Sequence, residues 1–187
     1  MKLVVGLGNV GREYDNTRHN VGFMFLDGII DEFKLNKRFN ALECEKTINN
    51  ERVIFIKPLS FMNLSGEVVV KYVNYYKINI SDILVIQDDL DMDLGKYKLM
   101  YNHGDGGHNG IKNIILNLGS REFLRLKIGI SNRKDIDTRD YVLGKFNPME
   151  LKTVNYVFNL LNDLIIDYIC LDREILIGKY NSKIQEG

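Results

Sequence analysis

Histidine and carboxylate side chains are the groups of this sequence whose positions suggest acid–base chemistry. His19 stands in a polar loop behind a glycine-rich turn, and VIQDDLD (85–91) ends a predicted buried strand with carboxylates. In α/β sheets, ligands and catalytic groups gather at the carboxyl ends of strands. If Asp88 or Asp89 accepts one ring N–H of His19, the other ring nitrogen is free to take a proton from water. The plainer alternative is that these acids form a solvated turn.

Two further segments place polar side chains ahead of predicted helices. GDGGHNG (104–110) puts His108 and Asn109 in the first turn of a helix, where free backbone N–H groups can meet an anion or a carbonyl oxygen. FMN (61–63) precedes another helix. A Phe-Met pair is usually core, but the amide of Asn63 can donate and accept at once, as binding of a peptide group requires.

Gly6, Gly8 and Gly11 have the G-x-G-x-x-G spacing of a dinucleotide-binding turn. Such a turn needs a helix that opens directly on the glycines and an acid about 20 residues further on, at the end of the next strand. Here a polar segment follows Gly11, and the acids at that distance, Asp27 and Asp31, fall inside a predicted helix. We therefore expect no NAD site, and interpret the glycines as a tight strand-exit turn with positive φ.

Neither a metal centre nor a nucleophilic side chain is indicated. The acids and histidines offer enough metal ligands, but H-E-x-x-H is absent, and so is the G-x-S-x-G of serine hydrolases. Cys44 and Cys170 stand far apart and in no C-x-x-C spacing, which predicts buried thiols rather than a metal site or a disulfide. A water activated by histidine remains, and we expect no metal and no cofactor.

The elements that must position these residues follow the alternating pattern of an α/β domain with a partly parallel sheet. Apolar residues at helical spacing predict helices over 21–33, after a turn at Ser65-Gly66, and from Gly107 to Leu118. After Pro148 we expect one helix and then a shorter one. No repeat or linker interrupts the chain, so we predict one domain over 1–187. Strands are expected near 2–7, 42–48, 52–57, 82–87, 95–100 and 124–131.

Composition adds limits on location and partners. With 45% hydrophobic and 27% charged residues the sequence is typical of globular proteins, and the absence of a membrane-length apolar run and of a signal-like start predicts a cytoplasmic protein without membrane contact. Lys+Arg and Asp+Glu balance at 25 each, so net charge does not indicate a nucleic-acid partner. Basic residues between 121 and 145 leave a local basic face possible.

Four motifs together resemble one known family. GLGNVGREYDNTRHNVG, FMNLSGE, DDLD and GGHNGIKNI, in this order and at these separations, are similar to bacterial-type peptidyl-tRNA hydrolase. The resemblance implies a single α/β domain with a mixed, mostly parallel central sheet surrounded by helices. It implies a monomeric, metal-independent esterase that cleaves a peptide or N-blocked amino acid from the 3′ ribose of tRNA, and so recycles tRNA from prematurely released peptidyl-tRNA.

The resemblance also assigns roles by position. His19 matches the general base and Asp88 the acid that orients it, while Asn63 and Asn109 would bind the peptide backbone and the terminal nucleotide. Asn9 is implicated in telling blocked from free aminoacyl-tRNA. Other matched positions would contact the 3′ CCA end or support the site, and these are Tyr14, Phe61, Met62 and His108. The positions that would clamp acceptor-stem phosphates are Lys98, Arg125 and Lys127.

Departures from the family pattern are few. Val10 stands where proline is usual, Gln87 where histidine is common, and the segment KLMYNHGDGG is slightly longer than is typical. The other function class that the sequence leaves open is a non-catalytic RNA-binding or ribosome-associated module on the same fold. Such a module would keep the basic residues but would need neither His19 nor Asp88.

Overall fold

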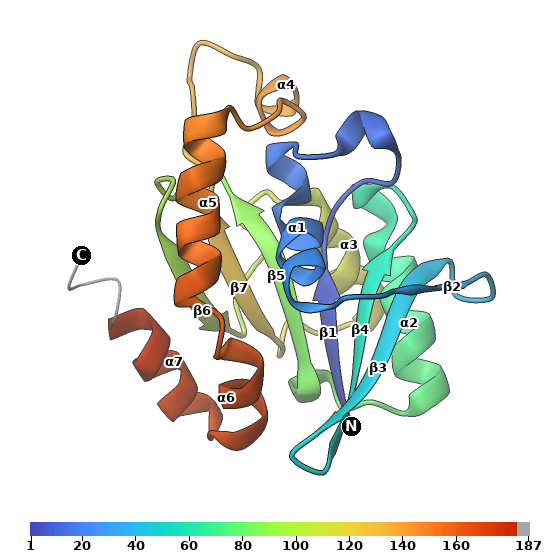
Figure 1. Ribbon diagram of the computed structural model, residues 1–187. Helices are drawn as coiled ribbons and strands as arrows, with labels where there is room; N and C mark the ends of the chain where they lie inside the picture. Colours follow the sequence, from blue (N-terminus) through green and yellow to red (C-terminus); the bar gives the residue numbers. More distant parts are fainter. Residues whose placement is uncertain (183–187) are drawn as a thin grey trace.

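A seven-stranded mixed sheet forms the centre of the computed structural model, which describes residues 1–182 (Figure 1). The strand order is β2-β3-β4-β1-β5-β7-β6, with β4, β1, β5 and β7 parallel and the outer pairs antiparallel. This arrangement confirms the α/β prediction. The strands are β1 (Lys2–Gly6), β2 (Lys34–Asn36), β3 (Ala41–Ile48), β4 (Glu51–Pro58), β5 (Ile83–Asp89), β6 (Tyr97–Tyr101) and β7 (Leu124–Gly129).

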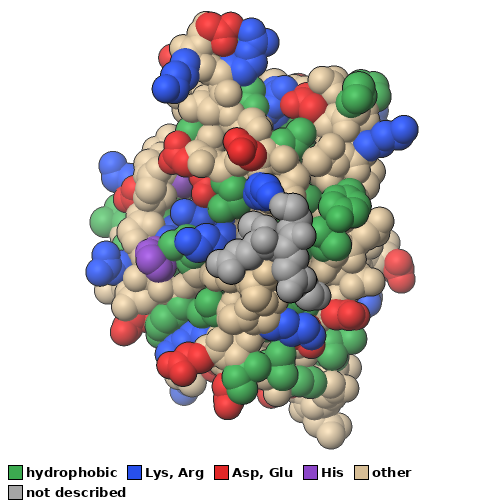
Figure 2. All heavy atoms as spheres, turned by 90° about the vertical axis from the view of Figure 1, so that its left-hand side faces the viewer, with side chains coloured by type: hydrophobic (Ala, Val, Ile, Leu, Met, Phe, Trp, Pro, Cys, Tyr) green, Lys and Arg blue, Asp and Glu red, His purple; other side chains and the backbone are tan. Residues whose placement is uncertain are grey.

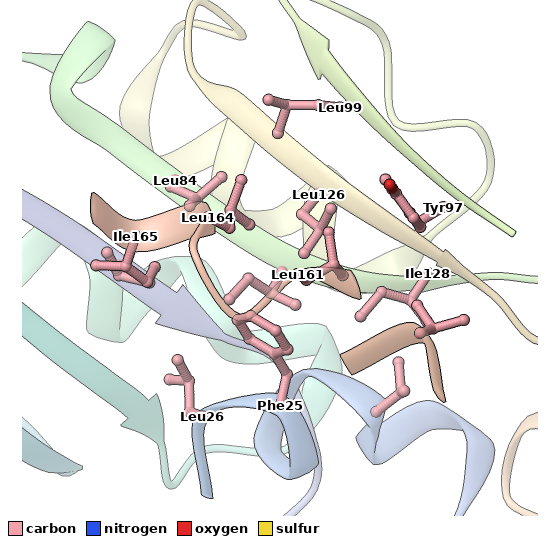
Figure 3. Packing of buried hydrophobic residues seen from close by; sticks show 14 of the residues in the cluster. Phe25, Leu26, Leu84, Tyr97, Leu99, Leu126, Ile128, Leu161, Leu164 and Ile165 are labelled. Atoms are coloured by element: carbon pink, nitrogen blue, oxygen red, sulfur yellow. The ribbon is translucent and has the colours of Figure 1, made fainter. Parts of the chain in front are cut away.

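Helices cover both faces of the sheet and enclose two apolar layers (Figure 1). One layer lies under α1, α5, α6 and α7, and Figure 3 shows Phe25 of α1 there with Leu126 and Ile128 of β7. The other lies under α2 and α3, where Tyr72 and Ile111 are buried. The α-helices are α1 (Val21–Ile29), α2 (Ser65–Tyr76), α3 (Asn109–Leu118), α4 (Thr138–Val142), α5 (Pro148–Leu160), α6 (Leu164–Cys170) and α7 (Arg173–Ser182).

The predicted strands all form, but several other sequence expectations are wrong. The first helix ends at Ile29 rather than near 33, because Ile30 is extended yet still buried, so the apolar spacing continues without helix. Asp31 therefore lies outside the helix. Ser65 and Gly66 begin α2 rather than forming a turn before it. The short elements β2 and α4 were not predicted, since three and five residues are too few to show a period.

The carboxy-terminal region also departs from the prediction. Apolar residues keep helical register across 154–168, but Leu161 caps α5 and a second break follows Cys170, which gives three helices instead of two. The expectation of buried thiols fails as well, because Cys170 is exposed and Cys44 only partly buried. Both thiols are free. Of the predicted domain 1–187, residues 183–187 lie outside the described part of the chain.

Close packing rather than positive φ explains most of the glycine-rich turn. Only Gly11 of the three has a positive φ, at 118°. A Cβ on Gly6 would lie 2.6 Å from the carbonyl oxygen of Gly22, and a Cβ on Gly22 would lie 2.4 Å from that of Ile86. The glycines thus let α1 pack directly against the ends of β1 and β5, which carries the loop before α1 over those strand ends.

This packing predicts that Gly22→Ala destabilises the protein by about 1–3 kcal/mol, because backbone atoms cannot yield to the added methyl group. Gly28→Ala is the matched control, since Gly28 lies in the same helix with nothing within 4 Å of a Cβ. The control should be neutral or stabilising by up to about 1 kcal/mol. Urea unfolding measures both; equal effects of the two substitutions would contradict the packing account.

Candidate active site

A cleft of about 760 Å³ lies at the carboxyl ends of the parallel strands β1 and β5. Gly6 pairs with Ile86 in the sheet, so the segments that follow these two residues emerge side by side. This is the edge at which α/β sheets carry their ligands. The residues that line the cleft and are singled out from the sequence are Asn9, Tyr14, His19, Phe61, Met62, Asn63, Asp88, Asp89, His108, Asn109 and Lys127.

His19 and Asp88 form the central pair of the cleft. His19 Nδ1 lies 2.8 Å from Asp88 Oδ2, and the carboxylate is only 2% exposed. Burial lowers the pKa of His19, but the charge of Asp88 and its hydrogen bond raise it, and the net shift is upward. Burial would raise the pKa of Asp88, yet the two adjacent imidazoles outweigh burial and hold it well below its usual range. Asp88 is therefore an anion that accepts the Nδ1 proton, which leaves Nε2 of His19 as the basic nitrogen.

His108 binds the other oxygen of the same carboxylate, with its ring centroid 5.1 Å from that of His19. Its Nε2 lies 2.8 Å from Asp88 Oδ1, while its Nδ1 accepts from the backbone N–H of Ile111 at 3.3 Å. Because Nδ1 is an acceptor, the ring proton sits on Nε2 and is donated to Asp88. His108 is thus the N-cap of α3 and not a free base. It stands one residue before the helix rather than inside its first turn.

The three side chains could also hold a metal ion, since one ligand atom of each lies within 4.8 Å of the others. In this arrangement each oxygen of Asp88 already accepts a hydrogen bond from one imidazole. Both oxygens of Asp88 are thus already hydrogen-bonded, while Nε2 of His19 stays available to the cleft. Metal independence stays a prediction that a chelation experiment can test.

Asn20, for which sequence reasoning predicts no role, fixes the loop that bears Asn9. Its side chain accepts from the Asn9 N–H at 2.8 Å and donates to the Asn9 carbonyl at 2.9 Å. Oδ1 of Asn9 in turn accepts from the backbone N–H of Met62 at 2.8 Å. Because Oδ1 is used in this way, Asn9 can offer the N–H donors of its Nδ2 group to a substrate in the cleft. A polar residue directly before an apolar helix was the available signal for Asn20.

Aromatic and amide side chains form another part of the cleft lining. Tyr14 and Phe61 meet edge to face with ring centroids 6.4 Å apart, and Phe61 is 54% exposed. Asn63 and Asn109 are exposed at the starts of a short 3-10 helix and of α3, so their amides are accessible. Met62 is buried behind them. Sequence reasoning missed the part of the cleft lining that comes from the α4 region: Asp137, Thr138, Arg139, Val142 and Leu143.

The three predicted phosphate ligands occupy different environments. Lys98 is exposed and lies directly opposite Lys127 across β6 and β7, while Lys127 lines the cleft 3.5 Å from the Asp89 carboxylate. Arg125 is 1% exposed and donates to the carbonyl of Gly104 at 2.8 Å. This burial argues against the predicted phosphate contact for Arg125. Through its hydrogen bond to Gly104, Arg125 instead holds the loop that leads to His108.

Comparisons with known proteins agree with the motifs. A family model described as peptidyl-tRNA hydrolase matches residues 3–186. The peptidyl-tRNA hydrolase of Fusobacterium nucleatum is 43% identical over 98% of this chain and 97% of its own, and that of Bacillus thuringiensis is 45% identical over 97% and 100%. A crystal structure of the Acinetobacter baumannii enzyme matches with a TM-score of 0.90 at 30% identity, covering 97% of this chain and 94% of that one. Sequence and fold thus agree over nearly the whole length, and the chain belongs to the peptidyl-tRNA hydrolase family.

Proposed function

We propose that this protein hydrolyses the ester that links a peptide to the 3′ ribose of tRNA, with His19 as general base. The observation that carries the proposal is the 2.8 Å contact between His19 Nδ1 and the buried carboxylate of Asp88, inside a cleft at the strand ends. A module that only binds RNA would not need a buried base–carboxylate pair. Family membership supports the substrate class.

The reaction begins when Nε2 of His19 removes a proton from water as the oxygen attacks the ester carbonyl carbon. The imidazolium that forms is stabilised by the Asp88 anion beside it. As the tetrahedral intermediate collapses, the bond to the ribose 3′ oxygen breaks and His19 returns the proton to that oxygen. Proton transfer of this kind contributes about 10²–10⁴-fold to a rate. An ester needs no nucleophilic side chain, because an alkoxide at a ribose is a better leaving group than an amine.

Donors for the developing oxyanion are available at the rim of the cleft. The amides of Asn63 and Asn109 are exposed there, and Nδ2 of Asn9 remains after its oxygen is used by Met62. Fixed N–H donors aimed at such an oxygen lower the barrier in a site shielded from water. These same amides suit the peptide group of an N-blocked substrate. A free α-ammonium in that position would leave an acceptor or donor unpaired, at a cost of about 1–3 kcal/mol.

Phe61 and Tyr14 form a surface that suits binding of the 3′ end of the tRNA. The exposed ring of Phe61, with Tyr14 against it, provides a face on which an unpaired adenine could stack. Stacking of a base on an aromatic ring contributes about 1–3 kcal/mol without sequence preference. Lys127 lines the cleft and Lys98 is its cross-strand neighbour on β6, so this pair would meet the phosphates of the acceptor stem. We expect the protein to act as a monomer in the cytoplasm.

The catalytic proposal predicts that the protein cleaves N-acetyl-aminoacyl-tRNA in the presence of EDTA, and that His19→Ala lowers kcat/KM by about 10²–10⁴-fold. His103→Ala is the matched control, because His103 is exposed in the loop after β6 and does not line the cleft. Release of the acetylated amino acid gives the rate. Full activity of His19→Ala would refute the base, and loss of wild-type activity in EDTA would refute metal independence.

The phosphate contacts predict a second, separable effect. Lys98→Ala should weaken tRNA binding and reduce the slope of log K against log salt by about 0.9, the value for one lost phosphate contact. Arg125→Met should leave that slope unchanged and lower the unfolding temperature instead, because Arg125 is buried under the Gly104 carbonyl. Fluorescence titration of each variant with tRNA at several salt concentrations measures the two slopes. The opposite pattern would restore Arg125 as a phosphate ligand.

A further inference from the structure

Arg18, the residue before His19, connects the His19 loop to the α4 region, which also lines the cleft. Its guanidinium NH2 group donates to both carboxylate oxygens of Glu150, at 3.1 and 3.3 Å, and NH1 donates to the carbonyl of Tyr141 at 3.3 Å. The guanidinium carbon lies 4.4 Å from the centroid of the Tyr141 ring. Tyr141 belongs to α4 and Glu150 to the first turn of α5, so one side chain holds the ends of two helices.

Backbone contacts run alongside this ion pair. The N–H of Arg18 donates to the Gly144 carbonyl at 3.0 Å, and the N–H of Phe146 donates to the Asn16 carbonyl at 3.0 Å. Thr17 and Lys145 form a β-bridge between these two bonds. A Cβ on Gly144 would lie 2.6 Å from NH1 of Arg18, which shows how closely the guanidinium packs on the chain. Residues 16–18 and 144–146 therefore form a short two-stranded tie.

The tie adds to the attachment of α4, which also packs into the core through the buried side chains of Tyr141 and Val142. The Tyr141 hydroxyl donates to the Ile130 carbonyl at 2.6 Å, at the end of β7. Figure 1 shows α4 standing above α1, outside the layers of helices that cover the sheet. Five residues of the α4 region line the cleft, among them Thr138, Arg139 and Val142. The contacts of Arg18 connect this part of the cleft lining to the loop that bears His19.

We propose that Arg18 is a positioning residue that holds the α4 wall against the His19 loop and thereby shapes the cleft for substrate. Glu150 is its partner. At the carboxyl end of α4, NH1 of Arg18 shares the Tyr141 carbonyl with the backbone N–H of Gly144. Asp88 holds His19 independently, at 2.8 Å, so loss of the tie should impair substrate binding more than the chemical step. This inference rests on the proposed function for its kinetic part only.

The test compares Arg18→Gln, Glu150→Gln and the double variant. Glu150→Gln keeps an oxygen for the Asn147 N–H, which Oε1 accepts at 2.9 Å, so the cap of α5 survives. Lys2→Gln is the control, because Lys2 pairs with Asp82 at 3.1 Å at the far end of the sheet with similar exposure. Each tie variant should raise KM for N-acetyl-aminoacyl-tRNA about tenfold with kcat little changed. The double variant should resemble the single ones, and Arg18→Lys should restore part of the loss.

Hydrogen exchange of the backbone amides of Arg18 and Phe146 tests the tie without reference to activity. Exchange at these two amides should accelerate in Arg18→Gln and in Glu150→Gln, while amides of β1 and β5 stay protected as in Lys2→Gln. Unchanged exchange at both amides would overturn the tie. Faster exchange with an unchanged KM would overturn its role in binding. A wild-type protein that does not hydrolyse the ester would refute the proposed function, while the exchange result would still decide the tie.

Discussion

The buried carboxylate of Asp88 is the interaction on which the site depends. An ionised carboxylate that is 2% exposed would be strongly destabilising unless it were paired and hydrogen-bonded. Two imidazoles meet this requirement, one on each oxygen. The pairing fixes the ring proton of His19 on Nδ1. Through His108, whose other nitrogen accepts from Ile111, the same charge also fixes the start of α3. The orientation of the proposed base and the start of α3 therefore depend on one anion.

The surrounding backbone brings His19 to this anion. Gly6 and Gly22 allow α1 to approach the ends of β1 and β5 at contact distance, so the loop before α1 lies over the end of β5. Asn20 then binds both backbone groups of Asn9 and fixes the first part of that loop. Arg18 holds its other side to α4 and α5. Three consecutive residues, 18 to 20, thus link the wall, the base and the amide rim of the cleft.

The sequence predicted the parts of this arrangement that depend on strong local patterns. Apolar strands ending in polar residues located the cleft, and the motifs around His19 and Asp88 identified the family. Residues whose role is set by contacts distant in sequence were not predictable in this way. Arg18 meets Glu150 across 132 residues, and the burial of Arg125 depends on a loop 21 residues away. The sequence pattern predicts positive φ for the glycines of the turn. The structure shows that Gly6 is needed because α1 packs closely against β1, and such a contact between two elements is not visible in the sequence of either one.

The pH dependence of kcat/KM tests the central pair most directly, because its acid limb reports the pKa of the free enzyme's base. His19 must be neutral to accept a proton, and its pKa is raised from the ordinary value of 6.5. Activity should therefore rise with pH through a midpoint above 6.5. In Asp88→Asn the burial that lowers this pKa remains while the raising charge is lost, so the midpoint should move to lower pH and the maximal rate should fall. An acid limb at the same pH in both proteins, or none at all, would contradict the account.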